Sequence, residues 1–124
     1  MNKKDKELLF KDISARLPYR TMVKCITDYH HEFDEELSDI HIMNFYQFDV
    51  KPYLRPMSSM TEEEIVELKW LNEKCDTMPT FEYVPVENYR IYDWMNRHHF
   101  DYRGLIEKGL ALEAPEGMYN LEKE

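Results

Sequence analysis

The stretch "YRTMVKCITDY", Tyr19–Tyr29, decides the fold class, because it predicts a strand directly after a helix. It is rich in β-branched and aromatic residues, which favour an extended backbone. We expect a strand over Arg20–Asp28, in which successive side chains alternate between the two faces of a sheet. Val23 and Cys25 would share one face of this strand.

The segment before this strand has the period of a helix. Within Lys4–Leu17, the apolar residues Phe10, Ile13 and Leu17 recur at i, i+3 and i+7, as on one face of a helix. Pro18 should end that helix, because proline disfavours helical geometry in the residue before it.

The segment after the strand is acidic. Residues 30–39, "HHEFDEELSD", predict a turn or a long hairpin loop, with room for a short strand through His31–Phe33. The stretch "DIHIMNFYQFDV", Asp39–Val50, predicts a second strand with apolar side chains on both faces. Such a strand is typically covered, at least in part, on both sides.

A capping box predicts the next helix. Lys51–Met60 contains two prolines and should be extended and irregular. Thr61 and Glu64 have the spacing at which a hydroxyl and a carboxylate cap each other's backbone amides. The helix would run to about Lys74 and bury one apolar face, formed by Ile65, Leu68, Leu71 and Cys75.

A further helix is expected over Val86–Phe100, after a short strand over Thr80–Val84. The residues of its apolar face recur at helical spacing and are Ile91, Trp94, Met95 and His98. Histidine near the C-terminal end of a helix suits the helix dipole, so the paired histidines that follow Arg97 are consistent with a helix end.

A short last helix is predicted over Tyr102–Lys108. Asp101 would cap its start, and Gly109 would end it in a left-handed conformation. Gly104 lies inside this helix, and a close approach of another backbone would account for it.

Together these segments predict an α+β fold, with an N-terminal helix, a small antiparallel sheet of about three to four strands, and two to three covering helices. The 124 residues fit one domain, since domains most often have roughly 100–150 residues. We expect the first helix and the main strands in residues 1–54, a mainly helical part in 55–112, and an extended tail in 113–124.

The composition excludes several classes of function. The chain has 25 acidic and 16 basic residues and a formal net charge of −9, which disfavours non-specific nucleic-acid binding and anionic membrane surfaces. No segment approaches the roughly 20 apolar residues of a membrane span, so we expect a cytoplasmic protein. No glycine-rich phosphate loop is present, and no cofactor is predicted.

The histidines and nearby acids leave one enzymatic alternative open, a small metal-dependent hydrolase. Its ligands would be His98, His99 and Asp101, joined by side chains of the His30–Glu32 segment. Adjacent histidines on a helix point about 100° apart, however, and rarely serve one ion. The spacing also fits no familiar zinc pattern, so we favour helix termination and core packing for these residues and expect no metal.

The density of aromatic residues favours protein binding. Aromatics make up 14% of the chain, and Tyr and Trp suit surfaces that are partly apolar and partly wet. The candidate partner-binding residues are Tyr89, Tyr92, Trp94, Tyr102 and Arg103. We therefore expect a non-enzymatic acidic interaction protein that binds a protein partner.

Three blocks resemble a known family. They are "ARLPY" at Ala15–Tyr19, "KPYLRPMSSMTEEE" at Lys51–Glu64 and "DWMNRHHFDYRGLIEKGLALEAPEGMY" at Asp93–Tyr119. These stretches of sequence are similar to those of a family of short proteins encoded by gut anaerobic bacteria, their phages and mobile elements. The family has no established activity. The resemblance implies a bacterial or phage accessory protein, and it assigns no site residue.

Overall fold

The computed structural model describes residues 2–26, 31–47, 49–76 and 86–119. Its first helix, α1 (Lys3–Arg16), confirms the predicted N-terminal helix. The side chain of Asn2 caps it by accepting a hydrogen bond from the Asp5 amide at 2.8 Å. A 3₁₀ turn that contains Pro18 follows the helix, as expected where a proline prevents its continuation.

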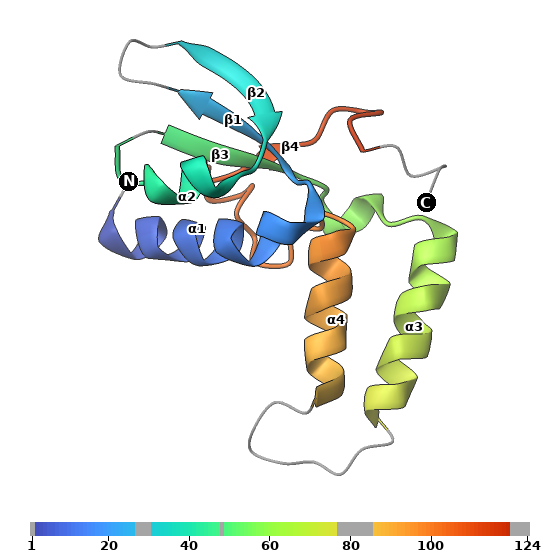
Figure 1. Ribbon diagram of the computed structural model, residues 1–124. Coiled ribbons are helices and arrows are strands. Elements are labelled where there is room, and N and C mark those ends of the chain that lie inside the picture. The colour runs from blue at the N-terminus through green and yellow to red at the C-terminus, as the bar shows by residue number, and fades with distance from the viewer. Residues whose placement is uncertain (1, 27–30, 48, 77–85, 120–124) are drawn as a thin grey trace.

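Four strands form one sheet in the order β2-β1-β3-β4 (Figure 1). These strands are β1 (Met22–Ile26), β2 (Glu32–Glu36), β3 (Asp49–Leu54) and β4 (Leu112–Glu113). The α+β class is thereby confirmed, but the sheet is mixed rather than wholly antiparallel. β1 pairs antiparallel with β2 and β3, whereas β4 runs parallel to β3. A parallel pair needs a long crossover connection, which the segment with α3 and α4 supplies.

The acidic segment is a strand and not mainly a loop. All five residues of β2 pair with β1, from Met22 opposite Glu36 to Ile26 opposite Glu32. Acidic residues have low strand propensity, so pairing with β1 decides their conformation. The position of β2 at the edge of the sheet leaves their side chains mostly in solvent.

The predicted strand over Asp39–Val50 is wrong for most of its length. Asp39–Met43 is the short helix α2, and Ser38 and His41 form a capping box at its start. His41 and Phe45 are buried, whereas Ile40 and Met43 are 62% and 81% exposed. In a strand, Met43 would share one face with His41 and Phe45, so its exposure beside these two buried residues fits a short helix followed by a turn and not a strand.

The strand lies instead where extended, irregular chain was predicted. β3 continues through Lys51–Leu54, and Pro52 pairs in register with Val23. β4 begins opposite Tyr53, so Pro52 lies where that side of β3 is still an edge and its missing amide proton is tolerated.

The capping box of α3 (Glu62–Asp76) is confirmed. The Glu64 amide donates to the Thr61 hydroxyl at 3.2 Å, and the Thr61 amide donates to the Glu64 carboxylate at 2.9 Å. Leu68 and Leu71 pack inward as predicted, but Ile65 is 40% exposed. The Cys75 side chain and the strand expected over Thr80–Val84 lie outside the described residues.

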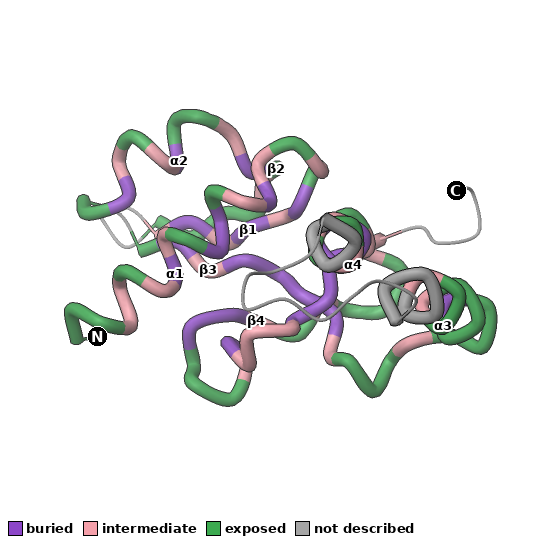
Figure 2. The backbone as a smooth tube through the Cα atoms, turned by 90° about the horizontal axis from the view of Figure 1, so that it is seen from below, coloured by how far each residue is buried: buried purple, intermediate pink, exposed green. Residues whose placement is uncertain are grey.

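α4 (Val86–Arg97) confirms the next helix and lies side by side with α3 (Figures 1 and 2). This helical pair extends away from the sheet, while α1 packs on one sheet face through Leu9 and Ile13. The chain therefore has two apolar clusters. One lies between α1 and the sheet, and the other, around Trp94, Met95 and Phe100, lies between α3 and α4.

The segment after α4 forms turns and not the predicted helix over Tyr102–Lys108. Asp101 still acts as a cap, because its carboxylate accepts from the amides of Leu105 and Ile106. Gly109 has a φ of +74°, as expected of a left-handed stop. Gly104 also has a positive φ, and no atom lies within 4 Å of the place where its Cβ would be, so close backbone approach does not explain it.

The C-terminal tail is anchored as far as Tyr119. The Tyr119 hydroxyl donates to the Tyr53 carbonyl at 2.7 Å and accepts from the Met22 amide at 2.8 Å. Its ring stacks on His99, with the ring centroids 3.8 Å apart. The predicted extended tail is therefore docked against the sheet up to this residue, and residues 120–124 lie outside the described part. None of the helices in the described ranges combines the length and apolar character needed to cross a membrane.

Candidate functional site

A cleft of about 610 Å³ opens between α1 and α4. Two side chains of α1 line it, Lys11 and Ala15, which are four residues apart and so share one helix face. The 3₁₀ turn contributes Tyr19. The remaining lining residues come from α4 and the turn after it, and they are Tyr92, Asp93, Asn96, Tyr102 and Arg103.

The two tyrosines from the C-terminal part differ in exposure and in hydrogen bonding. The rings of Tyr92 and Tyr102 are 5.4 Å apart between centroids. Tyr102 is held in place, because its hydroxyl donates to the Asn96 side-chain oxygen at 2.8 Å. Tyr92 is 50% exposed, so the cleft presents one fixed and one accessible aromatic ring.

A buried charge network fixes Arg103. The Asp12 carboxylate, which is wholly buried, accepts from Arg103 Nε at 3.0 Å and from Arg16 Nε at 2.9 Å. Arg16 also donates to the Phe100 carbonyl at 2.7 Å, which ties α1 to the segment after α4. Arg103 Nη2 lies 3.2 Å from the Tyr102 hydroxyl. The cation is therefore positioned by its neighbours and does not need to be ordered by a ligand.

Of the five predicted partner-binding residues, the structure brings Tyr92, Tyr102 and Arg103 together in the cleft. Trp94 is 2% exposed and donates its indole proton to Glu67 at 2.7 Å. It belongs to the core between α3 and α4 and is not available to a partner. The Tyr89 side chain lies outside the described residues.

Sequence reasoning missed the contribution of the N-terminal part to the cleft. Tyr19 contacts Asp93 through a hydrogen bond across 74 positions of the chain, and Lys11 and Ala15 reach the cleft only because α1 packs beside α4. No local pattern marks such contacts. The helical spacing of Lys11 and Ala15 shows only that they share a face.

The three residues of the metal-site alternative have separate partners. His98 Nδ1 lies 3.3 Å from Glu64, and His99 Nδ1 lies 3.2 Å from the Thr21 hydroxyl. The Asp101 carboxylate accepts two backbone amides, as described above. In the described ranges these three side chains form no common ligand set. In the His30–Glu32 segment, His31 is exposed and Glu32 Oε2 lies 3.9 Å from Lys24 Nζ. His30 is outside the described residues.

Burial keeps His99 neutral. Its burial, together with the positive charges of Arg16 and Arg55, lowers the pKa of His99 to about 3. The residue has a φ of +65° and lies between Thr21 and the Tyr119 ring. These contacts indicate a structural role for His99, which joins the end of α4 to the residue before β1 and to the C-terminal tail.

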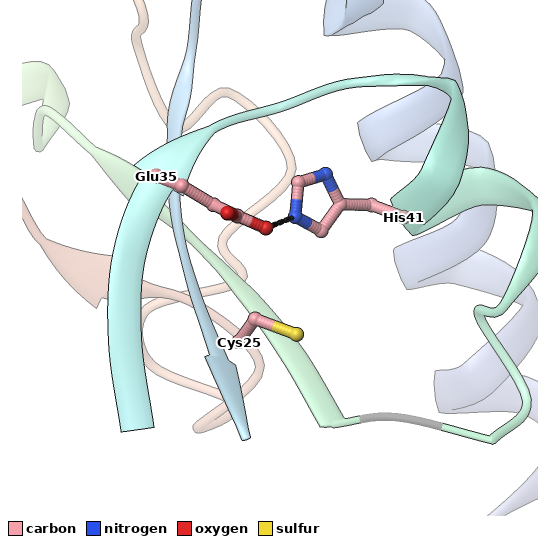
Figure 3. Close-up of side chains that lie close together, drawn as sticks. All are labelled: Cys25, Glu35 and His41. Atoms are coloured by element: carbon pink, nitrogen blue, oxygen red, sulfur yellow. Dashed lines mark hydrogen bonds and ion pairs between the residues drawn. The ribbon is translucent and has the colours of Figure 1, made fainter. Parts of the chain in front are cut away.

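A second group of polar side chains lies on the inner face of the sheet (Figure 3). Cys25, Glu35 and His41 come from β1, β2 and α2, and one potential ligand atom of each lies within 4.8 Å of the others. Glu35 is the acid of β2 that lies opposite buried Val23, and it accepts a hydrogen bond from His41 Nε2. The pairing of β1 with β2 and the position of α2 bring these residues together. No local sequence motif could therefore have predicted the cluster.

This inner cluster is not arranged for nucleophilic catalysis. The Ser38 amide donates to His41 Nδ1 at 2.9 Å, so a neutral ring carries its proton on Nε2, where Glu35 accepts it. His41 then has no lone pair left to take a proton from Cys25. Burial, with Glu35 and Asp49 nearby, raises the pKa of the Cys25 thiol, which keeps it protonated and unreactive.

Comparison of the chain with known protein families, with curated proteins and with solved structures finds no match.

Proposed function

We propose that this protein is a non-enzymatic interaction protein that binds a protein partner in the cleft between α1 and α4. One observation carries the proposal: a half-exposed tyrosine, Tyr92, stands beside Tyr102 and a prepositioned arginine, Arg103, in a concave site. Tyrosine and arginine in such a site are the residue types that dominate the energy of protein interfaces. Because Tyr102 and Arg103 are already held by hydrogen bonds, little ordering is needed on binding.

The charge of the chain indicates a basic partner. The net charge is −9, and the outer face of the edge strand β2 presents Glu32, Asp34 and Glu36 to solvent. Such a surface attracts a basic protein over a distance and raises its association rate. In the cytoplasm of a bacterium, as the family resemblance implies, an accessory or phage protein of this kind would mask a basic, nucleic-acid-binding surface of its target.

The experiment compares two exposed tyrosines. Tyr92→Ala removes the accessible ring of the cleft, and Tyr46→Ala removes a ring that is 70% exposed but lies after α2, away from the cleft. Wild type and both variants are used to capture proteins from the native host lysate at low salt. Captured proteins are quantified by mass spectrometry, and the affinity of the recovered partner is then measured with purified protein.

A partner retained by wild type and Tyr46→Ala, but bound at least about tenfold more weakly by Tyr92→Ala, supports the proposal, since interface tyrosines commonly contribute more than about 1 kcal/mol. Added salt should slow association of this partner. A partner that binds the Tyr92→Ala variant as tightly as wild type would contradict the role of the cleft. Recovery of no stoichiometric partner would contradict the function itself.

A further inference from the structure

We propose that Cys25, Glu35 and His41 form a binding site for a borderline-soft divalent cation of the Zn²⁺ class. The three residues are contributed by β1, β2 and α2. Figure 3 shows Glu35 and His41 pointing toward one another with Cys25 beside them, and one potential ligand atom of each lies within 4.8 Å of the others. Thiolate, imidazole and carboxylate are the three ligand types that zinc sites in proteins use. This site lies on the inner face of the sheet, and the proposal is independent of the cleft and its partner.

The separations of the ligand atoms are close to those that a metal requires. Tetrahedral ligands at about 2.0–2.3 Å from zinc lie roughly 3.3–3.6 Å from one another. The ligand atoms of the cluster all lie within 4.8 Å of one another. When a cation binds, the most widely separated pair would have to approach by about an ångström at most. The Glu35 and His41 ligand atoms, which are now hydrogen-bonded, would have to move apart. Cys25 and His41 are each 2% exposed, which means that the fold holds two of the ligands in place before a cation arrives.

The charge at the site favours a divalent ion. A Cys25 thiolate and the Glu35 carboxylate together balance a charge of +2, with His41 neutral. Without a cation, burial disfavours the thiolate first, and the carboxylates of Glu35 and Asp49 add to that effect. A bound cation reverses this repulsion, because a coordinating thiol loses its proton outright. The thiol proton passes to solvent, so binding releases one proton per cation from Cys25.

Binding also requires that the ring proton of His41 move from Nε2 to Nδ1, where the Ser38 hydroxyl can accept a hydrogen bond from it. The Nε2 proton is replaced by the cation, and a neutral ring then carries its proton on Nδ1. Ser38 Oγ lies 3.3 Å from Nδ1 and can accept that proton, while the bond from the Ser38 amide is given up. Metal-bound histidines commonly donate their second ring nitrogen in this manner.

The fourth position would belong to water. Glu35 is the one ligand with solvent access, since its side chain is 43% exposed. Three protein ligands with one open position are typical of accessible zinc sites rather than closed structural ones. A cation at this point would link β1, β2 and α2, so its binding should stabilise the part of the fold that contains the edge strand.

The test uses the 124-residue chain without an affinity tag. Zn²⁺ binding is measured by calorimetry, and Co²⁺ is added separately to detect the charge-transfer absorption of a cobalt–thiolate bond. Cys25→Ala and Glu35→Gln each remove one ligand. Glutamine can still accept from His41, and the Glu35 side chain is partly exposed, so this variant retains the local fold. The matched controls are Cys75→Ser, which removes the other thiol of the chain, and His31→Gln, which replaces an exposed histidine.

The expected result is one Zn²⁺ per chain, an affinity lowered at least about tenfold in both ligand variants, and unchanged affinity in both controls. The cobalt–thiolate absorption should disappear in Cys25→Ala and persist in Cys75→Ser. Absence of stoichiometric binding by the wild type, or equal affinity of wild type and Glu35→Gln together with a cobalt–thiolate absorption that survives Cys25→Ala, would overturn the proposal.

Discussion

Arg55 and Glu64 form a buried ion pair with two hydrogen bonds, 2.7 Å from Nη1 to Oε2 and 2.6 Å from Nη2 to Oε1. The pair joins the residue after β3 to the first turn of α3. Glu64 also accepts from the Thr61 amide in the capping box, and the Arg55 guanidinium lies 4.1 Å from the centroid of the Phe100 ring. One carboxylate therefore ties the sheet to the helical pair.

Replacing Glu64 should cost far more than removing its cap partner. Glu64→Gln keeps a capping side chain but leaves Arg55 buried without a counter-charge, and removal of one member of a buried pair typically costs about 3–5 kcal/mol. Thr61→Ala removes only the cap and should cost about 1 kcal/mol. Chemical denaturation of both variants measures the difference, with exposed Glu63→Gln as the control. Equal losses in Glu64→Gln and Thr61→Ala would show that the pair with Arg55 contributes little.

Stability should fall as the pH drops below 6.5. The pKa of His99 is about 3 in the folded chain against an ordinary value of 6.5, so the unfolded chain binds more protons between these values. Burial opposes the charge of Glu64, but hydrogen bonds from Arg55 and the Thr61 amide lower its pKa from 4.5 to about 2. Its contribution is therefore lost only as the pH falls through 4.5 toward 2.

Of these two residues, His99 alone accounts for the window between pH 4.5 and 6.5. His99→Asn should flatten the pH dependence of the free energy of unfolding there, and asparagine tolerates the positive φ of this position. Urea denaturation at several pH values measures the slope. If wild type and variant lose stability in parallel between pH 6.5 and 4.5, the low pKa of His99 is not the cause.

The two tryptophans should behave in opposite ways. Trp94→Phe removes buried packing and the hydrogen bond to Glu67, and we expect a loss of about 2 kcal/mol. Trp70 is 55% exposed, and Trp70→Phe should stay within about 0.5 kcal/mol of wild type. Acrylamide quenching gives an independent measurement: the fluorescence that remains in Trp70→Phe should be protected, and that in Trp94→Phe accessible. Efficient quenching of Trp94 would contradict its place in the core.

Substitutions at Gly104 should destabilise the fold through backbone strain and not through crowding. Its φ is +73° and the space around its Cβ position is open, so Gly104→Ala should lose about 1 kcal/mol through the left-handed backbone alone. Gly104→Asn, although larger, should lose less, because asparagine visits this region more readily. Thermal denaturation of both variants tests the order. A larger loss in the asparagine variant would indicate crowding instead.

The sequence by itself determined the elements that depend on local signals. α1 is fixed by its apolar spacing and by Pro18, and the start of α3 by the capping box of Thr61 and Glu64. The alternation of Val23 and Cys25 in β1 is equally local, because a strand buries every second residue. The resemblance to a family contributed no residue of the candidate site.

Only the tertiary structure decided the elements whose local signals were weak or in conflict. The segment around Ile40 and Ile42 has β-branched residues, but burial of His41 in α2 and of Phe45 in the turn after it outweighs that preference. The acidic strand β2 exists because β1 supplies its hydrogen-bonding partner.

Both candidate sites are products of tertiary structure as well. The cleft joins Tyr19 to Asp93 across the packing of α1 against α4, and the inner cluster joins Cys25 to His41 through strand register and a capping box. Local propensity acts over a few residues, whereas these contacts depend on which surfaces are buried together. That choice is made by the whole chain when it folds.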